Sequence, residues 1–115
     1  MSDPTLFERI IAREIPADII YEDEHCLCFR DISPQAPVHV LLVPKKPIPR
    51  IGLATDDDRG LLGHLMSCIP VIASQEGIAT DGFRVVINNG PNGGEVVPHL
   101  HLHILGGKKL REPMA

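Results

Sequence analysis

The segment Pro98-His99-Leu100-His101-Leu102-His103-Ile104-Leu105-Gly106-Gly107 decides how the rest of the chain is interpreted. Three of the six histidines stand here at every second position, with leucines between them. Strict alternation is the period of a β-strand, in which successive side chains point to opposite faces. The pattern therefore predicts a strand over residues 98–105. Its leucine and isoleucine side chains would face a core, and three imidazoles would form a row on the other face.

A single metal ion cannot be held by all three histidines of a straight strand. Neighbours on one face are about 6.8 Å apart, which separates the outer pair by about 13 Å, whereas zinc needs ligand atoms at about 2 Å. A further ligand would have to come from elsewhere, and His39 is the natural candidate. Cys26 and Cys28 are more simply interpreted as small apolar residues of a buried strand. The pattern permits zinc without requiring it, and we expect neither a metal nor a cofactor.

An imidazole can instead attack phosphorus or an acyl carbon directly, if one ring nitrogen is free and the other donates to an orienting group. His101 is best placed, because its neighbours can shape both sides of the bound group. Donors for the developing negative charge are also needed. The turn-rich loop 89–94 ends in Gly93-Gly94, which permits close backbone approach, so N–H groups just after it could hold a phosphate. His64 and His25 are interpreted as ordinary helix and turn residues.

The helices and strands predicted along the chain indicate one α+β domain over residues 1–115. A helix over residues 5–13 would begin with a capping box from Thr5 to Glu8. A longer helix would begin at Thr55, bend at Pro70, and end near Gly77. Strands are predicted over residues 19–21, 26–29, 38–44, 83–88 and 98–105. We expect an antiparallel sheet with both helices on one face, and a hairpin formed by the last two strands.

Composition excludes several classes of function. The chain has 115 residues, a net charge of −4 and a pI near 5.8, and it lacks tryptophan. We therefore expect no nucleic-acid partner. Its start does not resemble a secretory signal, and no apolar run approaches the ~20 residues that cross a bilayer. With three cysteines in no disulfide-framework spacing, the expectation is a cytoplasmic protein with reduced thiols and no membrane contact.

The alternating segment resembles the His-φ-His-φ-His-φ-φ signature, with φ apolar, of the histidine triad (HIT) superfamily. Further stretches resemble its Hint branch, the purine nucleoside phosphoramidases. They are Ile10-Ile11-Ala12-Arg13-Glu14-Ile15-Pro16, Asp31-Ile32-Ser33-Pro34-Gln35-Ala36-Pro37-Val38-His39, Val43-Pro44-Lys45-Lys46, Leu61-Leu62-Gly63-His64-Leu65-Met66 and the loop through Gly93-Gly94. The agreement is co-linear over nearly the whole chain.

The resemblance implies a five-stranded antiparallel sheet with two helices, and a homodimer that joins two such sheets into one of ten strands. It implies binding of a purine nucleoside monophosphate. The implied reaction is hydrolysis of a P–N bond between AMP or GMP and an amine, through a nucleotidyl-histidine intermediate.

The resemblance also assigns residues. His101 matches the nucleophile, and His103 matches the residue that contacts phosphate and assists the leaving group. His99 and His39 match a relay that sets the tautomer of the nucleophile. The matches for nucleotide binding are Asp31 and Ile32 at the ribose and base, Asn88 and Gly94 in the phosphate loop, and Glu95 and Val96, which follow in that loop.

Two departures bear on the leaving group. Val96 stands where some relatives carry serine, and the tail 108–115 lacks the tryptophan-proline ending of others. Two further functions remain open: a nucleotide-binding regulator with little catalysis, and a dinucleoside polyphosphate hydrolase. Dinucleoside polyphosphate hydrolases of the superfamily usually carry a glutamine near the third histidine. This chain has Leu105 and Gly106 there, which favours the phosphoramidase.

Overall fold

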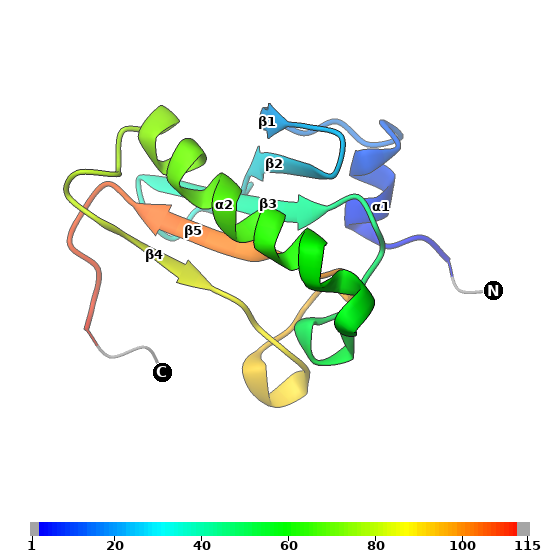
Figure 1. The fold of residues 1–115 in the computed structure, drawn as a ribbon. Helices are drawn as coiled ribbons and strands as arrows, with labels where there is room; N and C mark the ends of the chain where they lie inside the picture. Colours follow the sequence, from blue (N-terminus) through cyan, green and yellow to red (C-terminus); the bar gives the residue numbers. More distant parts are fainter. Residues whose placement is uncertain (1–2, 113–115) are drawn as a thin grey trace.

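The computed structural model describes residues 3–112, so the first two residues and the last three of the polar tail lie outside it. It is an α+β fold with one five-stranded antiparallel sheet, as predicted, and the strands follow one another across the sheet in the order β1-β2-β3-β5-β4 (Figure 1). The strands are β1 (Ile19–Glu22), β2 (Cys26–Arg30), β3 (Val38–Pro44), β4 (Phe83–Val86) and β5 (Leu102–Gly106). The helices are α1 (Leu6–Ile11) and α2 (Arg59–Gln75).

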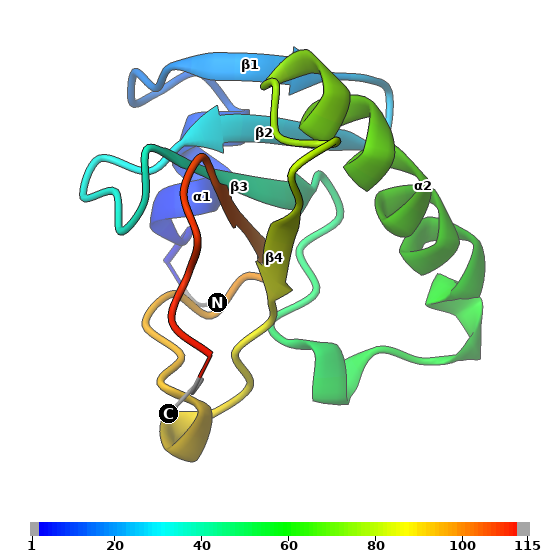
Figure 2. The same ribbon diagram turned by 90° about the vertical axis from the view of Figure 1, so that its left-hand side faces the viewer.

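The two helices lie on opposite faces of the sheet, so the expectation that both share one face is wrong (Figure 2). The long helix α2 covers the face that carries Val40, Leu42 and the leucines of the histidine segment. The short helix α1 packs through Phe7 and Ile10 on the other face, against residues of β2 and β3. Because α1 has only six residues, it covers part of that face and leaves the remainder free for a site.

Strand β3 is central, as its nearly continuous apolar sequence predicts. It pairs with β2 on one side and β5 on the other, and its residues from His39 to Pro44 are all buried. Alternation along β3 sends Val40 and Leu42 toward α2, while Leu41 faces α1. His39 shares the parity of Leu41 and therefore belongs to the α1 face.

The histidine segment is shorter as a strand than predicted. Strand β5 begins at Leu102, so His99 lies in a bend and His101 in irregular backbone before it, and only His103 lies within it. The cause is Pro44 at the end of β3, which has no N–H to continue the ladder. Its carbonyl accepts a hydrogen bond from the His99 ring instead. The alternation nevertheless persists, since Leu100, Leu102 and Ile104 all enter the core beneath α2.

Local signals at the helix ends are mostly confirmed. The capping box between Thr5 and Glu8 is present, but α1 ends two residues early, before Arg13 in the left-handed region at φ 64°. A second capping box joins Thr55 to Asp58, where a 3₁₀ turn leads into α2. Strand β4 also ends two residues before the predicted boundary. Within residues 3–112, neither helix has the length and hydropathy needed to cross a membrane.

Candidate active site

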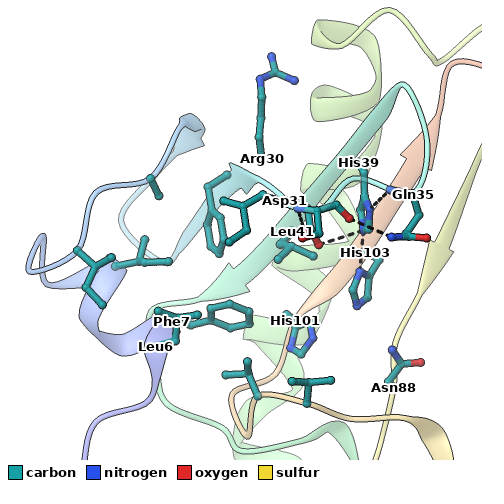
Figure 3. A pocket seen from close by; sticks show the side chains of 18 of the residues that line it. Leu6, Phe7, Arg30, Asp31, Gln35, His39, Leu41, Asn88, His101 and His103 are labelled. Atoms are coloured by element: carbon teal, nitrogen blue, oxygen red, sulfur yellow. Dashed lines mark hydrogen bonds and ion pairs between the residues drawn. The ribbon is translucent and has the colours of Figure 1, made fainter.

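A cavity of about 480 Å³ opens on the α1 face of the sheet (Figure 3). Its volume lies within the range of small-molecule sites. One end is apolar and is lined by Leu6, Phe7, Ile10, Ile15, Phe29 and Leu41. The other end is polar and is lined by Asp31, Gln35, His39, Asn88, His101 and His103. The cavity therefore presents an apolar surface for a flat group beside a cluster of imidazoles.

A hydrogen bond to a backbone carbonyl orients the ring of His101. Its Nδ1 lies 2.7 Å from the carbonyl oxygen of His99. A carbonyl only accepts, so Nδ1 carries the proton and Nε2 keeps a free lone pair in the neutral ring. The edge of Phe7 packs against this ring, with centroids 4.9 Å apart and planes at 81°. His101 is thus a buried, fixed imidazole with one unprotonated nitrogen on the cavity side.

His103 receives the opposite tautomer through a chain of hydrogen bonds. The backbone N–H of Gln35 donates to Nδ1 of His39 over 3.0 Å. His39 must then carry its proton on Nε2, which lies 2.9 Å from Nδ1 of His103. Because His103 accepts at Nδ1, its proton is on Nε2. One site therefore contains a ring with a lone pair, His101, and a ring with an N–H, His103.

Burial favours the neutral forms of His103 and His39 by lowering their pKa values. It lowers the pKa of His103 to about 4, helped by the neighbouring His101 and His39 and opposed by the Asp31 carboxylate. Burial also lowers the pKa of His39, again against Asp31. Neutral imidazoles can serve as nucleophile and donor at once, whereas protonated rings would have no lone pair to offer.

The predicted relay through His99 and His39 has a different geometry in the structure. His99 contributes its backbone carbonyl to His101, while its own Nε2 donates to the Pro44 carbonyl over 2.8 Å. Its side chain is 1% exposed and is not part of the cavity lining. Its Nδ1 is buried and has no hydrogen-bond partner within residues 3–112. His39 contacts His103 rather than His101.

Most of the predicted nucleotide-binding residues line the cavity: Asp31, Ile32, Asn88, Gly94 and Val96. Asp31 is held by the N–H of Ser33 at Oδ1, and its Oδ2 lies 3.5 Å from His39 Nε2. Ile32 and Val96 are 96% and 87% exposed, which places them at the rim.

Glu95, which the resemblance places at the nucleotide, does not line the cavity. Its carboxylate accepts two hydrogen bonds from Arg50, at 2.9 and 3.0 Å, and one from the N–H of Gly90. The Arg50 guanidinium, with Gly90, lowers the pKa of Glu95 to about 2. Glu95 therefore joins the turn at Gly90 to the side chain of Arg50.

The loop itself also differs from expectation. The N–H groups of Gly93, Gly94 and Glu95 donate to carbonyls of Gly90 and Pro91, so they are not free to hold an anion. Gly90 and Gly94 adopt φ of 72° and 77°, a conformation that L side chains rarely adopt. Within residues 3–112, the first amide after the turn that makes no backbone hydrogen bond is that of Val96.

The apolar end of the cavity was not predicted from the sequence. Phe7 falls within the predicted helix 5–13, and Phe29 and Leu41 fall within predicted strands, but nothing in those patterns assigns them to a site. A signal existed in strand parity, because Leu41 stands two residues after His39 and must share its face. No signal pointed to the backbone N–H of Gln35, whose position depends on how the loop 31–37 folds.

One set of cavity residues has metal-ligand chemistry. Asp31, His39 and His103 offer three ligand atoms within 4.8 Å of one another. In the geometry described above, Nε2 of His39 and Nδ1 of His103 already satisfy each other. An ion at this place would have to break that hydrogen bond.

Comparisons with known proteins place the chain in a family. The HIT domain model matches residues 12–110. An uncharacterized HIT-like protein of Synechococcus elongatus is 57% identical over 113 residues, covering 98% of both chains. A 14 kDa zinc-binding protein of Zea mays is 49% identical, covering 96% of this chain and 87% of its own.

Solved structures agree. A HIT family hydrolase from Legionella pneumophila superposes with a TM-score of 0.94 at 43% identity, covering 97% of this chain and all of its own. A histidine triad protein from Clostridium difficile gives 0.93 at 40% identity, covering 98% and 99%. The family match over most of the chain, together with the alternating histidines at the cavity, shows that this protein belongs to the HIT family.

Proposed function

We propose that this protein hydrolyses the P–N bond of purine nucleoside 5′-phosphoramidates, releasing a nucleoside monophosphate and an amine. One observation carries the proposal: the free Nε2 of His101 and the Nε2–H of His103 stand at the polar end of one nucleoside-sized cavity. A nucleophile and a donor to the phosphoryl group are what this reaction requires. The description of the Legionella relative as a hydrolase supports the general class.

The cavity lining suits the parts of a nucleotide. The flat base would pack among Phe7, Phe29 and Leu41 at the apolar end. The Asp31 carboxylate, whose side chain is 19% exposed, would accept hydrogen bonds from the ribose hydroxyls. The phosphoryl oxygens would accept hydrogen bonds from the His103 N–H and from the amides that begin at Val96.

The chemistry proceeds in two displacements at phosphorus. In the first, the lone pair on His101 Nε2 attacks phosphorus, the P–N bond to the amine breaks, and the leaving amine takes up a proton through His103 or water. His101, now bonded at both nitrogens, is a cation beside the His99 carbonyl, which stabilises its N–H. In the second, water attacks phosphorus and its proton returns to His103, or passes to solvent where water protonated the amine, and the bond from phosphorus to His101 Nε2 breaks so that the nucleotide leaves.

The face of β5 favours this substrate over a dinucleoside polyphosphate. Leu105 shares the parity of His103 and carries no polar group for a second phosphate. Gly106 points toward α2, where an added Cβ would lie 3.0 Å from Ile78. Neither position can supply the hydrogen bond expected of a polyphosphate hydrolase.

The proposal includes the homodimer. Strand β4 is an edge of the sheet, and Phe83 and Ile87, on or beside it, are each 37% exposed. An apolar edge strand is a place where a second sheet can pair. Light scattering should give twice the mass of one chain, whereas a monomer at micromolar concentration would contradict the ten-stranded sheet.

The name of the maize relative raises a second candidate, zinc held by Asp31, His39 and His103. A third candidate is a nucleotide-binding regulator with little catalysis. Activity that survives a strong chelator would exclude the second, and rapid turnover would exclude the third.

The direct test is release of AMP from adenosine 5′-phosphoramidate. Wild type should turn over, and His101→Ala should lose nearly all activity because it lacks the nucleophile. His25→Gln is the matched control, since His25 is exposed and distant from the cavity lining. Absence of turnover by wild type, or full turnover by His101→Ala, would refute the proposal.

A further inference from the structure

A second cluster of ligand-type side chains lies on the face of the sheet opposite the cavity. It consists of Asp23 in the β1–β2 turn, Cys26 at the start of β2, and His64 and Cys68 of α2. Their ligand atoms all lie within 4.8 Å of one another. We propose that Asp23, Cys26, His64 and Cys68 form a zinc site that fastens the β1–β2 turn to α2.

The spacing of each pair explains why the four meet. His64 and Cys68 are four residues apart and so lie on the same face of α2. Asp23 and Cys26 are held together by the turn, because Asp23 Oδ1 accepts the backbone N–H groups of His25 and Cys26. These contacts fix the carboxylate before any ion arrives.

The distances match tetrahedral zinc. With Zn–S near 2.3 Å and Zn–N or Zn–O near 2.1 Å, a tetrahedron has S–S edges of about 3.8 Å and S–N or S–O edges of about 3.6 Å. Sγ of Cys26 and Sγ of Cys68 are 3.8 Å apart. Cys68 Sγ lies 3.6 Å from His64 Nε2 and 3.7 Å from Asp23 Oδ2. Cys26 Sγ lies 3.4 Å from Oδ1, the other oxygen of the Asp23 carboxylate, and the four ligand atoms all lie within 4.8 Å of one another.

One edge is shorter than a bound ion requires. Nε2 of His64 lies 2.7 Å from Asp23 Oδ2, which is a hydrogen bond, whereas the corresponding edge around zinc is about 3.4 Å. Zinc would replace the shared proton, and the two groups would separate by about 0.7 Å. The His64 side chain is 36% exposed and has room to make this adjustment.

The donor set favours zinc over magnesium or calcium, because thiolate and imidazole are softer ligands than those ions prefer. Both thiols are buried, while Asp23 and His64 face solvent at the entrance. On binding, each thiol gives up its proton to solvent. Four protein ligands close the coordination sphere, so the ion would have a structural role.

Tyr21 lies outside the four proposed ligands and contacts two of them. The hydroxyl of Tyr21 donates to Asp23 Oδ2 over 3.0 Å and lies 3.6 Å from Cys68 Sγ. Such contacts orient metal ligands. Cys28, the third thiol, is buried two residues along β2 and is not among the four. Cys28 therefore keeps its interpretation as an apolar core residue, whereas Cys26 becomes a proposed zinc ligand.

The test is titration of the metal-free, reduced protein with Co²⁺ and then Zn²⁺. We expect one ion per chain, with thiolate-to-cobalt charge-transfer bands and the intense visible bands of tetrahedral Co²⁺. Cys68→Ala and His64→Gln should each weaken binding at least about 10-fold. Cys28→Ala, the matched buried-thiol control, and His103→Gln, which removes the competing cavity ligand, should bind as wild type does.

A second readout is stability. At about 100 times its Kd, zinc should raise Tm by about 10 °C in wild type and leave Cys68→Ala unchanged. Three results would overturn the proposal: cobalt bound without charge-transfer bands, affinity unchanged in Cys68→Ala, or a Cys26–Cys68 disulfide that forms in air while zinc is present. Hydrolysis should be unaffected by Cys68→Ala, because the cluster is on the face opposite the cavity.

Discussion

The low pKa of His103 predicts a specific loss of stability in acid. In the folded protein, burial and the neighbouring rings lower the pKa of His103 from 6.5 to about 4. Between these two pH values the unfolded chain binds a proton that the folded chain does not, so the folded state loses stability as the pH falls. One pKa unit corresponds to about 1.4 kcal/mol. From pH 7.5 to 4.5 the contribution of His103 amounts to about 2.5 kcal/mol.

Urea unfolding at a series of pH values measures this contribution. Wild type should lose about 2.5 kcal/mol more than His103→Gln over that range, because glutamine does not titrate. His39 and His99 also have lowered pKa values from burial, so both proteins should still lose some stability in acid. His25→Gln is the surface control for loss of a histidine, since His25 is exposed. Equal pH dependence in wild type and His103→Gln would refute the assignment of a buried neutral ring.

Three further predictions concern the cavity and its support. His101→Ala should lower kcat at least about 10³-fold while AMP still binds, as measured by turnover and calorimetry; an unchanged kcat would contradict its role. Asp31→Asn should raise KM about 10-fold for a ribonucleotide but not for the 2′,3′-dideoxy substrate; equal effects on both would place Asp31 elsewhere. Leu102→Ala, at a side chain 2% exposed, should lower the free energy of unfolding by about 2–5 kcal/mol, and a loss below about 1 kcal/mol in urea unfolding would contradict its place in the core.

Features encoded by local chemistry could be predicted from the sequence. The alternation of the histidine segment identified which side chains enter the core, and the structure buries Leu100, Leu102 and Ile104. The capping box at Thr5 predicted the start of α1. The nearly continuous apolar run of β3, interrupted only by His39, predicted its central position. Each signal depends on residues within a few positions of one another, where propensity and periodicity are informative.

Features that depend on distant parts of the chain could not be predicted. Nothing local places α1 opposite α2, and that arrangement creates the apolar end of the cavity at Phe7. Glu95 stands in a loop that suggests phosphate binding, yet its partner is Arg50, 45 residues away. The tautomer of His103 depends on His39, which is 64 residues away in the sequence and is itself oriented by the backbone N–H of Gln35.

The central claim is that His101 attacks phosphorus and carries the nucleotide. It is tested most directly by mixing enzyme with adenosine 5′-phosphoramidate, quenching in alkali within milliseconds, and measuring the intact mass, followed by peptide mapping. We predict a transient gain of one adenylyl group on the peptide that contains His101, at a rate sufficient for turnover, and no gain in His101→Ala. Turnover with no adduct at any time, or an adduct on another residue, would contradict the account.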